Sequence, residues 1–159
     1  MGEVFAPGRQ RDSNGWLEYP RDKPLRAEMY PPELLEQIMT HPAKQQGYLH
    51  YDICHFVSKR GETILDPFGG VGTSLISATL GRNVILVEIE AYYADIIQRC
   101  VDYLDSQRYL SPASEKWGNM TVIQADNRVV LPIKCDHVIT SPPYGNDLYK
   151  ASESAGLTD

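Results

Sequence analysis

The sequence predicts an α/β fold with a doubly wound, mostly parallel sheet. Short apolar runs with strand character alternate with stretches that have helical apolar spacing, and a glycine-rich turn joins the first run to the stretch that follows it. Strands that alternate with helices form parallel sheets through right-handed crossovers. The predicted strands are residues 63–65, 83–89, 121–123 and 137–140.

The stretches around these strands carry helix signals. Residues 73–80 follow the glycine turn and end before Gly81, which provides a helix stop. Residues 91–104 place apolar side chains at helical intervals along one face. Ahead of the first strand, a Pro-Pro start predicts a short helix up to Met39, and residues 48–57 form a further helix candidate.

Residues 1–30 are rich in Arg, Pro and Gly and lack apolar periodicity, so we expect an extended arm or a flexible N-terminus there. Residues 31–159 then form one partial domain. The basic side chains of the arm are candidates for phosphate contacts, and a solvated tail is the alternative. These side chains are Arg9, Arg11, Arg21, Lys23 and Arg26.

Composition and charge narrow the class of protein. The 159 residues are 42% apolar and 23% charged, as in an ordinary globular domain. The sequence has neither an apolar run of the roughly 20 residues that span a membrane nor a secretory signal, so a cytoplasmic location is expected. Three scattered cysteines predict buried thiols rather than disulfides or a metal site. The net charge of -6 counts against a surface that binds nucleic acid.

Four polar residues stand at or just after the carboxyl ends of the predicted strands. They are Asp66, Glu88, Asp126 and Ser141. The carboxyl ends of parallel strands meet at one edge of a sheet, so these four residues are expected to face one crevice. The sequence therefore places a ligand site at this edge.

The glycine-rich turn at residues 69–72 lets a ligand approach the backbone closely. A phosphate-binding loop is excluded because Thr73 and Ser74 stand where that loop needs Lys. The dinucleotide fingerprint fits poorly, because Leu75 occupies the place of its third glycine. The pattern favours a ligand with little phosphate.

Acidic residues after the strands suit a ligand with a cationic amino acid end and a nucleoside. Asp66 can organise the loop and bind the cationic end, and Glu88 can accept from both ribose hydroxyls. Asp126 can accept from an adenine amino group while Ile89 packs on the ring. The alternatives are an exposed strand-end carboxylate for Glu88 and a loop cap for Asp126.

The segment Ser141-Pro142-Pro143-Tyr144 is the strongest signal in the chain. Proline cannot continue a central strand, so the pair ends the strand and stiffens the loop. The Ser141 side chain and the Pro142 carbonyl can accept from the two N–H bonds of an aromatic amino group, and Tyr144 can stack on a base turned out of a helix. The alternative is a turn with an incidental aromatic residue.

The two motifs resemble the cofactor loop and the catalytic loop of the S-adenosylmethionine-dependent methyltransferases that modify exocyclic amino groups of DNA bases. The resemblance covers about residues 31–147 and extends loosely to residues 41–44, which are similar to a segment that helps close the cofactor site. The matching cofactor positions are Asp66, Pro67, Phe68, Gly70, Gly72 and Thr73, with Val71 where Ser is frequent, followed by Glu88, Ile89 and Asp126.

The resemblance implies a Rossmann-like methyltransferase fold, S-adenosylmethionine as cofactor, no metal, DNA as partner and a role in restriction–modification. Ser141 before Pro142-Pro143 favours methylation of cytosine N4 over adenine N6. Methylation of a guanine amino group in RNA or of a protein amide is a rival. A cofactor-binding remnant that acts as an interaction module is another.

The family's complete fold has seven strands, whereas four are counted here. We therefore expect a truncated domain that ends after the catalytic motif and that is weak or inactive by itself. It would need a C-terminal half or a separate target-recognition subunit for activity on DNA.

Overall fold

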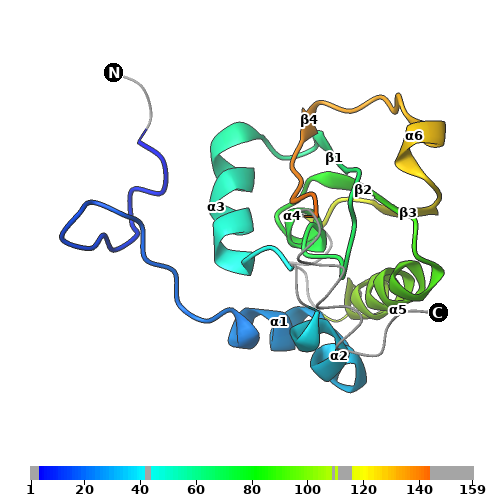
Figure 1. Cartoon of the computed structure of the whole chain (residues 1–159), viewed down its shortest axis with the longest axis horizontal. Helices are drawn as coiled ribbons and strands as arrows, with labels where there is room; N and C mark the ends of the chain where they lie inside the picture. The colour runs from blue at the N-terminus through cyan, green and yellow to red at the C-terminus, as the bar shows by residue number, and fades with distance from the viewer. Residues whose placement is uncertain (1–3, 42–43, 109, 111–115, 144–159) are drawn as a thin grey trace.

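The computed structural model describes residues 4–41, 44–108, 110 and 116–143. Its centre is a four-stranded sheet with the strand order β3-β2-β1-β4, and all three pairings are parallel (Figure 1). The strands are β1 (Thr63–Asp66), β2 (Asn83–Glu88), β3 (Met120–Gln124) and β4 (His137–Val138). This sheet confirms the predicted α/β fold with parallel strands.

The register brings the carboxyl ends of the strands together at one edge. Asp66 pairs with Leu86, and Glu88 pairs with Gln124. Strand β4 is shorter than the predicted 137–140, because only its two residues pair with β1. The Ile139 amide still donates to the Leu65 carbonyl over 3.1 Å, and the chain then leaves the sheet.

Six α-helices surround the sheet, counted over the described residues. They are α1 (Lys23–Met29), α2 (Leu35–Thr40), α3 (Gly47–Val57), α4 (Leu75–Thr79), α5 (Ala91–Arg108) and α6 (Asn127–Val130), and a short 3-10 turn (Pro32–Leu34) precedes α2. The predicted helices are found with shifted ends. Helices α1 and α6 were not predicted from the sequence.

Helices α3, α4 and α5 cover one face of the sheet. Ile64 and Val84 are paired neighbours and therefore point to the same face, where Ile64 contacts α3 and Val84 belongs to the cluster that includes α4 and α5. On the opposite face, Val138 remains 57% exposed. The face that carries Ile64 and Val84 is therefore covered by helices, while the opposite face leaves Val138 exposed.

Helix α1 corrects the expectation for residues 1–30. The segment that was expected to be an extended arm contains this helix, and Arg26, Met29 and Tyr30 are buried in the core. The helix escaped sequence reading because one of its buried positions holds a charged residue, which removes the apolar periodicity. The extended arm therefore ends at about residue 22.

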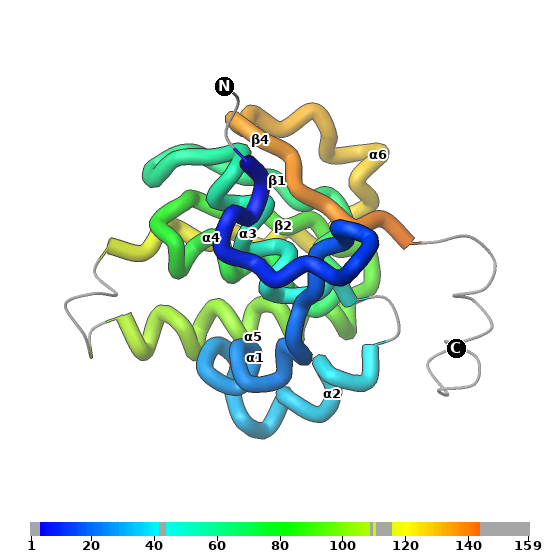
Figure 2. The backbone as a smooth tube through the Cα atoms, turned by 90° about the vertical axis from the view of Figure 1, so that its left-hand side faces the viewer, coloured from blue at the N-terminus to red at the C-terminus, as the bar shows by residue number. Residues whose placement is uncertain are grey.

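The arm itself runs along α3, as Figure 2 shows for the dark blue segment. The Arg9 guanidinium donates to the Asp52 carboxylate on α3 over 2.7 Å. Arg26 is ion-paired with Asp22 and has no exposed surface. Arg9 and Arg26, two of the candidates for phosphate contacts, are therefore paired with aspartates of the protein itself.

No helix within the described parts of the chain combines the length and the apolar character that crossing a membrane requires. Among the same residues, Cys54 and Cys100 are buried free thiols, and Cys135 is partly exposed.

Candidate cofactor and catalytic site

The glycine turn after β1 is shaped so that side chains would not fit. Gly70 and Gly72 have φ values of 53° and 79°, a region that favours glycine. At Gly69, an added Cβ would lie 3.0 Å from the Ile97 side chain and 3.3 Å from the Val87 carbonyl. The turn therefore packs closely against β2 and α5, where side chains in place of these glycines would not fit.

Asp66 is the polar centre of the site. Its carboxylate is buried and accepts hydrogen bonds from the hydroxyls of Ser74 and Thr140 and from the Phe68 amide. Burial raises the pKa of Asp66 to about 6, although these three donors pull it down. The side chain is therefore a desolvated carboxylate that would gain from a cationic partner.

Glu88 closes the glycine turn from the neighbouring strand. One carboxylate oxygen accepts from the Gly70 amide over 2.6 Å, and the other accepts from the Glu90 amide over 2.9 Å. The residue is only 8% exposed, and this burial raises its pKa. It is thus not the exposed strand-end carboxylate that was the alternative, and each oxygen retains capacity for a second donor.

A cavity of about 350 Å³ opens beside Glu88, at the ends of β2 and β3. Phe68 and Ile89 line it and expose 41% and 57% of their surfaces. Such exposed apolar side chains beside a carboxylate suit an aromatic ring that carries a sugar.

Asp126 also lines this cavity, but its carboxylate is occupied locally. It caps helix α6 by accepting from the Arg128 amide, and it forms an ion pair of 2.5 Å with the Arg128 guanidinium. These bonds to Arg128 lower the pKa of Asp126 to about 2. The loop-capping alternative therefore describes the contacts that Asp126 makes.

Ser141 lies in a separate, narrow crevice on the other side of Phe68. This crevice of about 20 Å³ is lined by Ser141 together with Asp66, the glycine turn and Lys44. Pro142 and Pro143 are exposed beyond it, and Tyr144 falls outside the described residues. The structure thus brings Ser141 next to the glycine turn, and Phe68 borders both spaces.

Two residues beneath the glycine turn have contacts that the sequence did not predict, and one of them, Arg26, was expected only as a candidate for phosphate contacts. The Arg26 guanidinium donates to the Thr73 hydroxyl over 3.2 Å and to the Gln45 carbonyl over 2.6 Å. The Tyr30 hydroxyl donates to the Gly72 carbonyl over 2.9 Å. We call Arg26 and Tyr30 the loop anchor. Since both contacts join residues more than 40 positions apart, no local pattern could have revealed them.

His50 connects α3 to the same region and makes stability sensitive to acid. Its ring nitrogens lie 2.8 Å from the Ser77 hydroxyl and 2.7 Å from the Gln45 side-chain oxygen, and burial lowers its pKa to about 4. The unfolded chain binds a proton near pH 6.5 while the folded chain does not, so stability is lost as pH falls from 6.5 to 4.

We expect His50→Gln to remove an acid-dependent loss of about 3 kcal/mol. Urea unfolding of both proteins at several pH values between 4 and 7 measures this difference. Parallel curves for the two proteins would contradict the assignment to His50.

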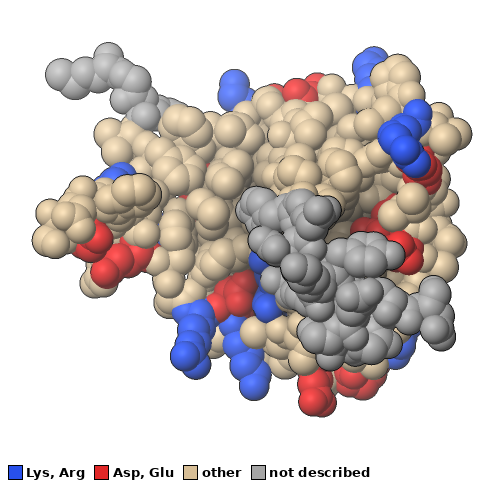
Figure 3. Space-filling view, viewed as in Figure 1, with Lys and Arg blue, Asp and Glu red and all other residues tan. Residues whose placement is uncertain are grey.

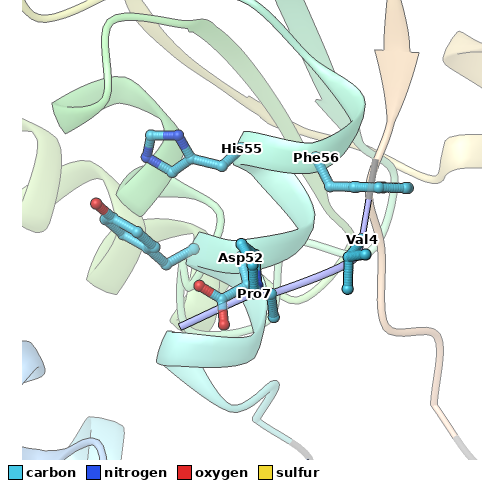
Figure 4. Close-up of a pocket in the computed structure, with 7 residues that line it drawn as sticks. Val4, Pro7, Asp52, His55 and Phe56 are labelled. Atoms are coloured by element: carbon cyan, nitrogen blue, oxygen red, sulfur yellow. The ribbon is translucent and has the colours of Figure 1, made fainter. Parts of the chain in front are cut away.

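Other features of the described residues lie away from the sheet edge. A cavity of about 540 Å³ lies between the arm and the outer side of α3, where Val4 and Pro7 face Asp52, His55 and Phe56 (Figure 4). None of its residues follows a strand. Within the described residues, no group of three or more His, Cys, Asp or Glu side chains is arranged to hold a metal ion.

Sequence comparison identifies two methyltransferase families that this chain matches. Residues 10–99 match the profile of the DNA methylase family, and residues 56–159 match the methyltransferase domain described as RMKL-like. Each of these two matches covers more than half of the chain. The chain therefore belongs to the DNA methylase family, whose methyl donor is S-adenosylmethionine.

Three solved structures are similar at low identity. A Pyrococcus abyssi tRNA (uracil-54, C5)-methyltransferase with S-adenosyl-L-homocysteine is 22% identical, with a TM-score of 0.47, over 69% of this chain and 26% of that chain. A tRNA m1G37 methyltransferase from M. jannaschii is 14% identical, with a TM-score of 0.44, over 80% and 33%. A Plasmodium falciparum dimethyladenosine transferase is 18% identical, with a TM-score of 0.42, over 79% and 38%. The chain spans less than half of each of these proteins.

Proposed function

We propose that this chain is the cofactor-binding and catalytic part of an enzyme that methylates an exocyclic amino group of a DNA base, with cytosine N4 favoured over adenine N6. The observation that carries this proposal is the position of Ser141 in the crevice that Asp66 and the glycine turn also line. An acceptor for the target amino group then lies beside the group that binds the methyl donor.

The residues present fit S-adenosylmethionine. The desolvated Asp66 carboxylate suits its cationic amino group, and Glu88 suits the ribose hydroxyls. The cavity of about 350 Å³ with Phe68 and Ile89 at its wall suits adenine. We infer that Asp126 contributes to this subsite because it lines the cavity, and that it does so while ion-paired with Arg128.

When bound, S-adenosylmethionine supplies an electrophilic methyl group on a sulfonium. The protein's task is to orient the weakly nucleophilic amino group toward it. The Ser141 hydroxyl and the Pro142 carbonyl accept from the two N–H bonds, which frees the nitrogen lone pair for the new C–N bond. Methyl transfer would form this C–N bond at the expense of the C–S bond of S-adenosylmethionine, and the nitrogen would then release one proton to solvent. Orientation supplies most of the catalysis.

DNA binding needs a positive surface, and we propose that it comes from a further C-terminal part or a target-recognition subunit. On the face shown in Figure 3, basic and acidic side chains are interspersed. The net charge of -6 also favours a separate DNA-binding part, because phosphate contacts rely on Lys and Arg.

RNA is the second candidate substrate, because the RMKL-like match covers the segment that contains Ser141. Incubation with labelled S-adenosylmethionine and either DNA or RNA, followed by mass spectrometry of the nucleosides, distinguishes the two. Methylcytosine or methyladenine from DNA supports the first proposal, whereas methylguanosine from RNA would replace it.

The cofactor site is tested by calorimetric titration with S-adenosylmethionine. We expect micromolar affinity for the chain as it is. Glu88→Ala should weaken binding about 10–100-fold, because it removes hydrogen bonds to a charged group worth about 1.5–3 kcal/mol.

The exposed residue Glu90 provides the control. Glu90→Gln should bind S-adenosylmethionine with the same affinity as the original chain. A folded chain without measurable binding, or Glu88→Ala binding as tightly as the control, would refute the proposed site.

A further inference from the structure

Thr140 joins the catalytic loop to the cofactor loop. Its hydroxyl donates to Oδ1 of Asp66 over 2.8 Å. The other carboxylate oxygen, Oδ2, accepts from the Ser74 hydroxyl at the start of α4. One buried carboxylate therefore holds both the residue before Ser141 and the helix that follows the glycine turn.

Residues 139–143, the described part of this loop, have few other attachments to the sheet. The last backbone bond from this segment goes from the Ile139 amide to the Leu65 carbonyl. Pro142 and Pro143 have no N–H to donate. Within the part of the chain that the structure describes, the Thr140 hydroxyl makes the only side-chain hydrogen bond from residues 140–143 to the strands.

We propose that Thr140 is a positioning residue that couples occupancy of the cofactor site to the placement of Ser141, through its hydrogen bond to Asp66. This inference rests on the proposed function, because it requires that S-adenosylmethionine binds at Asp66. A ligand amine and the Thr140 hydroxyl would both bond to the Asp66 carboxylate. Binding of the amine would therefore fix the orientation of this carboxylate, and with it the hydrogen bond from Thr140. Thr140 touches neither substrate nor cofactor in this account.

A purely structural role is the competing explanation. The hydroxyl would then only satisfy a buried carboxylate, as buried polar groups require. Removing it would lower stability equally with and without cofactor, and the response of the loop to cofactor would not change. The two explanations therefore differ in the ligand response rather than in stability.

The test is hydrogen exchange at the Thr140 and Ser141 amides, with and without saturating S-adenosylmethionine. Thr140→Val keeps the shape of the side chain and removes the hydroxyl, whereas Thr140→Ser keeps the hydroxyl. The exposed Thr121 on β3 provides the matched control, Thr121→Val. Calorimetry on each protein confirms that the cofactor is bound.

We expect the cofactor to slow exchange at these amides about tenfold in the original chain, in Thr140→Ser and in Thr121→Val. In Thr140→Val we expect binding weakened about 3–10-fold, because Thr140 acts indirectly and a typical hydrogen bond contributes about 0.5–1.5 kcal/mol, and we expect no slowing at saturation. Without cofactor, the amides of residues 140 and 141 should exchange faster in Thr140→Val than in the original chain, because the hydrogen bond to Asp66 is lost.

The pH dependence of binding provides a second measure. The Thr140 bond lowers the pKa of Asp66, while Glu88 on β2 raises it and Lys44 lines the same crevice. Loss of the bond should move the acid limit of cofactor binding above its original value near pH 6.

Cofactor protection of the loop in Thr140→Val equal to that in the original chain would overturn the proposal while the proposed function stands. If the original chain is folded but does not bind the cofactor, the proposed function fails, and the coupling fails with it.

Discussion

Asp66→Asn is expected to stabilise the unliganded protein while it weakens cofactor binding. The pKa of Asp66 is raised from 3.8 to about 6, so the folded protein holds a proton that the unfolded chain has lost between these values. The contribution of Asp66 to stability therefore falls as pH rises through this window, opposite in sign to the contribution of His50, and the ionised Asp66 carboxylate costs about 3 kcal/mol at pH 7. Asparagine removes the charge and should recover up to this amount.

The same substitution removes the anion that is proposed to bind the amino group of S-adenosylmethionine. We expect affinity to fall by one to two orders of magnitude, because hydrogen bonds to charged groups contribute about 1.5–3 kcal/mol. Urea unfolding and calorimetry on one preparation measure both effects. A variant that is less stable and still binds tightly would show that Asp66 serves the fold rather than the ligand.

Arg26→Ala is expected to have the largest effect on stability. The guanidinium is fully buried and bonds to Asp22, Thr73 and the Gln45 carbonyl. Removing one partner of a buried ion pair leaves an uncompensated charge and typically costs about 3–5 kcal/mol. Loss of the bond to Thr73 should also loosen the glycine turn.

Arg9→Ala is the matched control, because Arg9 also pairs with an aspartate but lies partly exposed on the arm. It should cost about 1 kcal/mol, as partly exposed ion pairs do. If Arg26→Ala does not fold, adding Asp22→Asn should restore part of the loss, since the unpaired charge is then gone. Equal losses for Arg9→Ala and Arg26→Ala would contradict the importance given to the buried network.

Local pattern was sufficient for the sheet and for its polar edge. Strand runs and the glycine turn predicted the order of elements, and Asp66 and Glu88 lie at the strand ends as expected. Pattern was insufficient for α1, where a buried Arg26 replaces the apolar residue that periodicity looks for. It also could not distinguish the two interpretations of Asp126, which depend on where Arg128 turns its side chain.

The loop anchor and Thr140 were not predictable from sequence for a different reason. Their roles come from contacts across 42 to 74 positions, which only the folded chain creates. Such residues look ordinary in the sequence, since an arginine, a tyrosine and a threonine outside any motif suggest no particular chemistry.

The separation of Arg26 and Thr73 along the chain also sets how long the first waits for the second during synthesis. The two residues are 47 positions apart. At roughly 5–20 residues per second, the ribosome takes about 2–9 s to make the second after the first. During that interval Arg26 can pair with Asp22 but cannot form its hydrogen bond to Thr73. The rate of translation, rather than thermodynamic stability, sets the length of this interval.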